Sequence, residues 1–249
     1  MMKDGFKDHF SGHADSYAKA RPGYPPELFE WLASLCNARA TAWDCATGSG
    51  QAAVMLAEYF DRVIATDAST EQIANAQPAA GVEYRVVPAE HSGLPDSSVD
   101  LVTVAQALHW FDVDAFCAEA RRVLKPEGVI AAWGYHLTRV TPQIDRIVDV
   151  FDAEIIGPCW PPERRHVDAR YRDLNFPFLP LNPPAFAMRM AWSRRQFLDY
   201  IGTWSAVRRY RQTKGHDPLA WLENEIAAYW HPDDVLDVSW PMFFLVGKA

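Results

Sequence analysis

The sequence of 249 residues contains no long apolar run and only four cysteines. The lack of an apolar stretch long enough to cross a bilayer predicts no membrane-spanning helix and no membrane partner. The first residues, Met-Met-Lys-Asp-Gly, do not resemble a secretory leader, so we expect a cytoplasmic protein. The cysteines show no C-x-x-C spacing, which is typical of free thiols and predicts neither disulfides nor a zinc site. We expect no metal.

An excess of positive charge is also absent, since the formal net charge is −8. Nucleic-acid-binding domains usually carry a basic footprint, so this balance argues against a nucleic-acid partner. The charge is unevenly distributed: residues 157–214 contain ten arginines and one lysine against four acids. Most of these arginines are expected to be solvated on helices and loops, although some could face an anionic ligand.

The segment most informative about function is residues 42–53, where an apolar strand runs through a glycine turn into a helix. Gly48 and Gly50 allow the backbone to turn tightly and approach a ligand, and the following helix N-terminus offers unpaired N–H groups. Asp67 ends the next apolar run, 17 residues after Gly50. A carboxylate there can accept hydrogen bonds from two ribose hydroxyls, so this arrangement predicts a nucleoside-binding site.

Helix and strand patterns alternate through the first 140 residues. We expect one strand that ends at Asp44 and others over residues 62–66, 82–87, 99–105 and 129–133, with a last strand over residues 240–246 that returns to the sheet. Strands joined by helices imply parallel pairing with both faces covered. The prediction is an α/β fold: a Rossmann-like, seven-stranded, mostly parallel sheet with helices on both faces, plus a helical and irregular cap insertion.

The composition changes after the fifth strand, because residues 157–185 are rich in proline and aromatic residues. Helices are predicted to begin at Thr141-Pro142, at Ser193 with Phe197, Ile201 and Trp204, and at Asp217-Pro218. We divide the chain into an N-terminal helical lid (residues 1–38), a cofactor-binding Rossmann-like core (39–156), a cap or substrate insertion (157–214) and a C-terminal helix and strand that complete the core (215–249).

Polar or aromatic residues follow five predicted strand ends: Asp44, Asp67, Ala89-Glu90, Ala105-Gln106 and Trp133. Ligands of open parallel sheets bind beyond the carboxyl ends of the strands, so these residues are predicted to converge on one site.

Two nucleoside cofactors fit the glycine turn. Gly48-x-Gly50-x-x-Ala53 with Asp67 matches the dinucleotide fingerprint, so an NAD(P)-dependent oxidoreductase stays open. Asp44 favours S-adenosylmethionine, because a carboxylate would repel a pyrophosphate but attract an ammonium and a sulfonium. A helical arm before the first strand also favours this cofactor. A catalytically silent scaffold that binds the cofactor is a further alternative.

The order of motifs resembles class I S-adenosylmethionine-dependent methyltransferases of type 11. The matching segments run through residues 40–134: Asp44-Cys45-Ala46-Thr47-Gly48-Ser49-Gly50, Val63-Ile64-Ala65-Thr66-Asp67, Pro88-Ala89-Glu90, Val99-Asp100-Leu101-Val102-Thr103 and Val123-Leu124-Lys125-Pro126-Glu127-Gly128. Tyr17-x-x-x-Arg21-Pro22-x-Tyr24-Pro25 and residues 105–112 are similar to the branch that contains trans-aconitate and cantharidin-resistance methyltransferases.

The resemblance implies a role for each matching position. Asp44, Gly48 and Gly50 would flank the methionine part of S-adenosylmethionine, and Asp67 would hold the ribose. Ala89 and Glu90 would border the adenine, and Ala105 and Gln106 would lie beneath the sulfonium. The predicted cofactor set also includes Arg21, which could instead anchor the N-terminal arm, and Ala46, Gln51 and Ala68. The family often has glycine at the place of Ala46 and an acid at the place of Pro88.

Methyl transfer from a sulfonium is an in-line displacement, so orientation of the acceptor is the main requirement. A carboxylate acceptor is already ionised near neutral pH, whereas phenols, thiols and amines can require a general base. His109 and Tyr17 are the candidate catalytic residues, although His109 could be structural beside Trp110. The candidate substrate-binding residues are His13, Trp110, Trp133, Trp160, Arg170, Trp204 and Arg208; the tryptophans could equally fill the core. We expect a methyltransferase that acts on a small anionic molecule, as a monomer or a homodimer.

Overall fold

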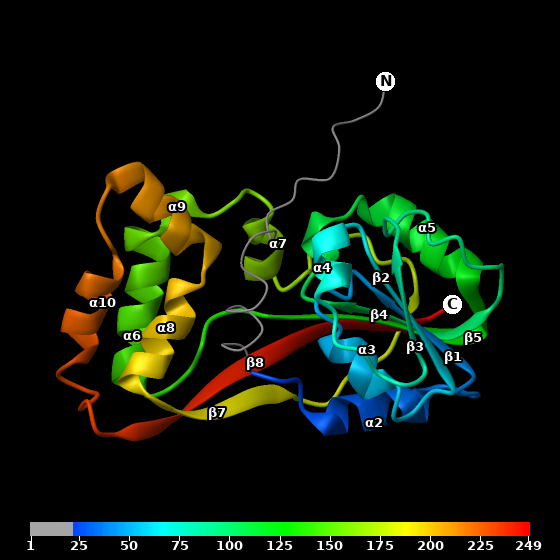
Figure 1. Ribbon diagram of the computed structural model, residues 1–249, viewed down its shortest axis with the longest axis horizontal. Coiled ribbons are helices and arrows are strands. Elements are labelled where there is room, and N and C mark those ends of the chain that lie inside the picture. The colour runs from blue at the N-terminus through cyan, green and yellow to red at the C-terminus, as the bar shows by residue number, and fades with distance from the viewer. Residues whose placement is uncertain (1–21) are drawn as a thin grey trace.

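The computed structural model describes residues 22–249, and its core is a single twisted sheet (Figure 1). Within these residues, seven strands follow the order β3-β2-β1-β4-β5-β8-β6. Their bounds are β1 Thr41–Cys45, β2 Arg62–Asp67, β3 Val82–Val86, β4 Val99–Ala105, β5 Leu124–Tyr135, β6 Leu179–Pro180 and β8 Val235–Lys248. Strands β1 to β5 pair in parallel, and β8 runs antiparallel to both β5 and β6. The predicted fold class is confirmed.

Helices cover both faces of this sheet. On one face α2 (Pro26–Leu35) and α3 (Gln51–Leu56) pack against β1, with Leu28, Phe29 and Ala53 in one buried cluster. On the other face α5 (Val113–Val123) packs against Trp43 and its neighbours. Strand β4 is buried along nearly its whole length, as expected for a central parallel strand that is covered on both sides.

Local sequence signals set where these helices begin. Ser69 caps α4 (Thr70–Ala74) by accepting the N–H of Gln72, and Asp112 caps α5 by accepting the N–H of Ala115. Helix α3 ends at Leu56, because hydrogen bonds from Glu58 and Tyr59 to carbonyls three residues earlier replace the α-helical pattern.

A second group of helices gathers at one end of the molecule (Figure 1). It consists of α6 (Pro142–Val150), α8 (Arg194–Gly202), α9 (Ser205–Lys214) and α10 (Leu219–Ile226), and it has its own buried cluster. A ribbon of β8 and β7 (Ala187–Ser193) reaches from the sheet to this group. The short helix α7 (Arg164–Asp168) lies between the two groups, after the π-helical turn η2 (Phe151–Ile155) and the 3-10 turn η3 (Gly157–Cys159).

Several elements of the cap and of the sheet differ from their predictions. The helix predicted at Ser193 is confirmed, with a capping box to Gln196, but it ends at Gly202 and does not carry Trp204. Trp204 has an extended backbone and precedes the unpredicted helix α9. Strand β7 was also not predicted, and β5 begins at Leu124 rather than at residue 129. The division into four domains stays a prediction.

Between residues 22 and 249, no helix is long and apolar enough to span a membrane. Cys45, Cys117 and Cys159 are buried, Cys36 is half-buried, and each of the four thiols is free.

Candidate active site

The loop after β1 has the backbone of a tight ligand-binding turn. Ala46, Gly48 and Gly50 all have positive φ angles, of 54°, 56° and 86°. Gly50 lies directly before α3, and a Cβ atom at this position would overlap the Tyr84 hydroxyl. Ala46 adopts the same left-handed region with a methyl group, which costs about 1 to 2 kcal/mol relative to glycine. The sequence therefore keeps the turn geometry but adds strain at its first position.

Asp44, at the carboxyl end of β1, is fully buried. Its Oδ2 atom accepts the Thr47 hydroxyl at 2.5 Å and its Oδ1 atom accepts the Thr103 hydroxyl at 2.8 Å. Burial raises the pKa of Asp44 to about 6, while these two hydrogen bonds act in the opposite direction. The side chain is therefore mainly ionised at pH 7, and no Lys, Arg or His among residues 22–249 forms an ion pair with it. A buried negative charge without a cation attracts a cationic ligand.

Asp67, at the end of β2, connects two loops of the site. Its Oδ2 atom accepts the N–H of Gly48 at 2.9 Å, and its Oδ1 atom accepts the N–H of Ser69 at 2.8 Å. These bonds fix the orientation of a carboxylate that is only 9% exposed. A carboxylate oxygen can accept more than one hydrogen bond, so this orientation is compatible with ribose hydroxyl groups. Gln51 is the first residue of α3, and Ala68 directly follows β2.

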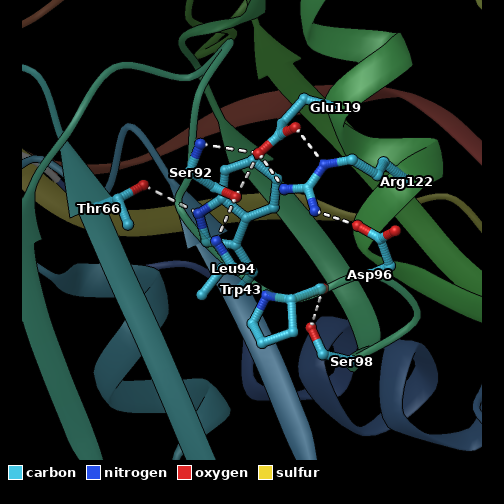
Figure 2. A network of polar contacts seen from close by, with 9 residues as sticks. Trp43, Thr66, Ser92, Leu94, Asp96, Ser98, Glu119 and Arg122 are labelled. Atoms are coloured by element: carbon cyan, nitrogen blue, oxygen red, sulfur yellow. Dashed lines mark hydrogen bonds and ion pairs between the residues drawn. The ribbon is translucent and has the colours of Figure 1, made fainter.

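The loop over residues 88–98 carries the predicted adenine neighbours and is fastened to α5 (Figure 2). Glu119 of α5 accepts both the N–H and the hydroxyl of Ser92, at 2.8 and 2.5 Å, and pairs with Arg122 at 2.8 Å. Arg122 in turn pairs with Asp96 of the same loop. The hydrogen bonds from Arg122 and then from Ser92 lower the pKa of Glu119 to about 2. This network holds the loop in place, although Glu119 is nowhere in the predicted site.

Within that loop, Ala89 and Glu90 are half-buried. The Oε1 atom of Glu90 accepts the N–H of Asp112 at 3.2 Å, so the side chain faces the start of α5.

Gln106 joins the carboxyl ends of β4 and β5. It follows Ala105, the last residue of β4, and has a φ angle of 56°. Its Oε1 atom accepts the N–H of Tyr135 at 2.7 Å, and its Nε2 atom donates to the Tyr135 carbonyl at 3.1 Å. The side-chain amide therefore serves to align the two strand ends.

His109 lies in the 3-10 turn η1 (Leu108–Trp110), three residues after Gln106. Its Nδ1 atom is 3.0 Å from the Tyr171 hydroxyl, and its ring contacts Trp110 with centroids 4.7 Å apart. Deep burial, with a smaller contribution from the charge of Arg164, lowers the pKa of His109 to about 3. This side chain is neutral at physiological pH, and its Nδ1 atom is already engaged.

Arg164 of α7 contacts several residues of the cap. Its guanidinium lies 4.2 Å over the Trp160 ring and 3.7 Å from Asp152, and its Nε atom donates to Asp168 at 2.9 Å. Asp168 Oδ1 also lies 2.8 Å from Nε2 of His136, the first residue after β5. The cluster therefore fixes α7 to the end of the sheet.

Sequence comparisons agree with this arrangement. A family model described as a methyltransferase domain matches residues 43–132, which includes Asp44, Asp67 and Gln106. A Dictyostelium discoideum protein named as a methyltransferase is 34% identical over 251 residues, and the alignment covers 98% of this chain and 95% of that protein. The chain belongs to the methyltransferase family. An uncharacterised methyltransferase of Mycobacterium tuberculosis is 36% identical over 120 residues, which cover about half of each chain (48% and 49%).

Solved structures are also similar to this methyltransferase over nearly the whole chain. A structure described as a type II methyltransferase from Anaeromyxobacter dehalogenans has a TM-score of 0.87 and 47% identity, and covers 92% of this chain and 97% of its own. The [4+2]-cyclase SpnF has a TM-score of 0.50 at 17% identity, covering 94% and 90%, and is similar in fold alone.

The structure brings only some of the predicted substrate residues of this methyltransferase together. Trp160 and Trp204 are in contact, with ring centroids 5.8 Å apart. Trp133 instead packs between Tyr24 and Phe29, fully buried, as a core residue. Arg170 is exposed, and Arg208 is half-buried on α9. His13, Tyr17 and Arg21 lie outside the described residues.

The most prominent site residues that sequence reasoning missed are His136, Asp168 and Arg164. The spacing of Arg164 and Asp168, four residues apart, is a recognisable signal of a helical ion pair. No local pattern connects either residue with His136. Residues 22–249 contain no group of three or more His, Cys, Asp or Glu side chains that could hold a metal ion.

Proposed function

We propose that this methyltransferase uses S-adenosylmethionine to methylate a small anionic molecule. The observation that carries the cofactor assignment is the fully buried carboxyl group of Asp44, with which no Lys, Arg or His of residues 22–249 forms an ion pair. A ligand with an ammonium and a sulfonium compensates the negative charge of this group, whereas the pyrophosphate of a dinucleotide would be repelled. The same argument disfavours the NAD(P)-dependent oxidoreductase.

The residues of the site fit the parts of S-adenosylmethionine. Asp67 has the orientation to hold the ribose. Gly48 leaves room for the methionine part, because a Cβ there would meet only the Gln72 side chain, at 3.8 Å, whereas Gly50 lets the turn pack against Tyr84. Ala89 and Glu90 border the adenine in this assignment, and Ala105 and Gln106 lie at the end of β4 beneath the reacting group. Ala46, Gln51 and Ala68 complete the set, with Arg21 as a further proposed contact. When bound, the cofactor supplies an electrophilic methyl group for an in-line displacement.

The charge of the cap supports an anionic acceptor. Residues 157–214 carry a surplus of seven positive charges, and the cap lies beside the carboxyl ends of the strands. Many of its arginines are occupied or solvated: Arg211 pairs with Asp217, and Arg195 is 92% exposed. Arg208 and the Trp160–Trp204 pair are the proposed substrate contacts. The resemblance to the trans-aconitate branch makes carboxylic acids the first acceptors to test. We propose no nucleic-acid partner, and a monomer or homodimer.

Isothermal titration calorimetry with S-adenosylmethionine and S-adenosylhomocysteine tests the cofactor assignment, with NADH fluorescence quenching as the competing measurement. We expect binding of the first two and none of NADH. A panel of di- and tricarboxylic acids, phenols and amines tests the acceptor class. Methylation of phenols or amines without an anionic group, with none of the acids, would contradict the anionic acceptor. Cofactor binding with no turnover of any acceptor would favour the silent scaffold.

A further inference from the structure

The His136–Asp168 pair has the arrangement of a proton acceptor held by a carboxylate. His136 Nε2 lies 2.8 Å from Asp168 Oδ1, and the Arg164 Nε–H donates to the same oxygen at 2.9 Å. An ionised carboxylate only accepts hydrogen bonds, so the Nε2 atom of His136 must carry the proton of this contact. The Nδ1 atom of the neutral imidazole is then an unprotonated acceptor.

The position of His136 connects it to the reaction site. It follows Tyr135, the last residue of β5, whose N–H and carbonyl are both bound by Gln106. Gln106 is the strand-end residue that the cofactor assignment places beneath the reacting group. His136 is 29% exposed at its side chain, so the imidazole is accessible from outside the protein.

Two other histidines lie in this region, and neither has an open acceptor nitrogen beside its partner. His166 of α7 has both ring nitrogens engaged, because Nδ1 lies 2.7 Å from Asp173 Oδ2 and Nε2 accepts the Arg165 Nε–H at 3.4 Å. His109 Nδ1 is held by the Tyr171 hydroxyl at 3.0 Å. Tyr171 and Arg170 both have positive φ angles, of 61° and 54°, which is an unfavourable backbone for large side chains. Strain of this kind persists where the surrounding structure requires it, and here it places the buried Tyr171 hydroxyl on His109. The pair is suited to shaping the site, while its histidine is poorly suited to accept a proton.

We propose that His136, oriented by Asp168, accepts the proton of the methyl acceptor. This inference rests on the proposed methyl transfer, and it narrows the acceptor to one whose attacking oxygen, sulfur or nitrogen carries a proton. Any carboxylate of an anionic substrate would then lie elsewhere in the molecule.

The step balances as follows. The acceptor atom forms a bond to the methyl carbon, the bond between that carbon and sulfur breaks, and its electron pair stays on sulfur. The acceptor's proton moves to Nδ1 of His136, and Asp168 stabilises the imidazolium that forms.

Four influences act on the protonation of His136. Burial and the charge of Arg164 lower its pKa, and the carboxylates of Asp152 and Asp168 raise it. Asp152 belongs to η2, accepts the Trp160 Nε1–H at 3.0 Å and lies 3.7 Å from Arg164. A lowered pKa keeps the imidazole neutral at physiological pH, so its Nδ1 atom is ready to accept a proton.

The first test is an NMR titration of the histidine side chains in the cofactor-free protein, which requires no activity. Asp168→Asn removes the carboxylate that stabilises the imidazolium, so the His136 pKa should fall by about one unit. His231, which is 70% exposed and 3.7 Å from Asp233, provides a matched histidine–aspartate control. Its titration should stay unchanged in Asp168→Asn. An unmoved His136 titration in a folded Asp168→Asn variant would overturn the proposal.

The second test compares His136→Gln with His231→Gln in cofactor calorimetry and single-turnover assays on a phenolic acid. His136→Gln should keep cofactor affinity, lose at least about 100-fold in rate at pH 7 and recover towards the wild-type rate above the phenol's own pKa. His231→Gln should change neither quantity. A folded His136→Gln variant with the wild-type rate at pH 7 would overturn the role of His136 and leave methyl transfer standing. Failure of the wild-type protein to bind S-adenosylmethionine would instead overturn the proposed function, and this inference with it.

Discussion

The Asp67 carboxylate accepts the backbone N–H of Gly48 at 2.9 Å, which ties the end of β2 to the glycine turn after β1. One acid thus has two functions in this account: it stabilises the turn, and it is the proposed ribose ligand. Substitutions in the two loops should therefore affect stability and cofactor affinity in ways that can be separated.

Replacement of Asp44 by Asn should stabilise the cofactor-free protein at alkaline pH. The pKa of Asp44 is about 6 in the folded protein, above the unfolded value of about 3.9. The protonated side chain therefore stabilises the folded state below pH 4, and this contribution is lost as the pH rises through 6. At pH 8 the ionised side chain costs on the order of 2 to 3 kcal/mol. Asp44→Asn should thus raise the Tm at pH 8 by several degrees and much less at pH 4.

Thermal unfolding at the two pH values measures this difference, and calorimetry on the same variant should show a loss of S-adenosylmethionine affinity. An exposed control is Asp233→Asn, whose side chain is 92% exposed. A lower Tm of Asp44→Asn at pH 8, compared with the wild type, would contradict the assigned cost of the buried charge.

Replacement of Glu119 by Gln should remove part of the acid sensitivity of the fold. The pKa of Glu119 is about 2 in the folded protein, below the unfolded value of about 4.3, so its stabilisation is present above pH 4.3 and is lost as the pH falls towards 2. Glu119→Gln should lower the free energy of unfolding by about 1 to 3 kcal/mol at pH 7 and by little at pH 2.

Urea unfolding at both pH values checks this expectation, with Glu58→Gln, an exposed residue of the segment after α3, as the control. An equal loss of stability at pH 7 and pH 2 would indicate that the ionised carboxylate is not the source of the effect.

Replacement of Ala46 by Gly should stabilise the turn or leave it unchanged. The φ angle of 54° costs an alanine about 1 to 2 kcal/mol, whereas glycine's greater unfolded-state entropy costs about 0.4 to 1 kcal/mol. The balance favours Ala46→Gly by about 0 to 1.6 kcal/mol. The same change at Ala52, inside α3, should destabilise by about 0.5 to 1 kcal/mol. The urea concentration at the midpoint of unfolding measures the stability of both variants. A midpoint for Ala46→Gly as low as that for Ala52→Gly would refute the strain assigned to Ala46.

The strand ends of this fold could be predicted from the sequence because their signals are local. Apolar runs that end at Asp44, Asp67 and Ala105 identify β1, β2 and β4 without knowledge of their partners. The parallel sheet then follows from the helices between them, and it brings those ends together.

The remaining features depend on tertiary contacts that no local pattern contains. Trp133 ends an apolar run, and this pattern is the same for a residue that lines a site and for one that fills the core. The contacts of its ring with Tyr24 and Phe29 show that it belongs to the core. The His136–Asp168 contact joins residues 32 positions apart through the placement of α7. Helix α9 was missed because Trp204 continues the apolar spacing of α8 although its own backbone is extended.

The most direct test of the central claim is calorimetric titration of S-adenosylmethionine into the wild-type protein and into Asp67→Ala, with near-UV circular dichroism to confirm the fold. We expect saturable binding to the wild type and an affinity at least about 100-fold lower for Asp67→Ala, because two hydrogen bonds to a charged group are lost. Asp67→Asn, which keeps one acceptor oxygen for the backbone, should be intermediate. The absence of binding to the wild type at millimolar concentration, or an unchanged affinity of Asp67→Ala, would contradict the account.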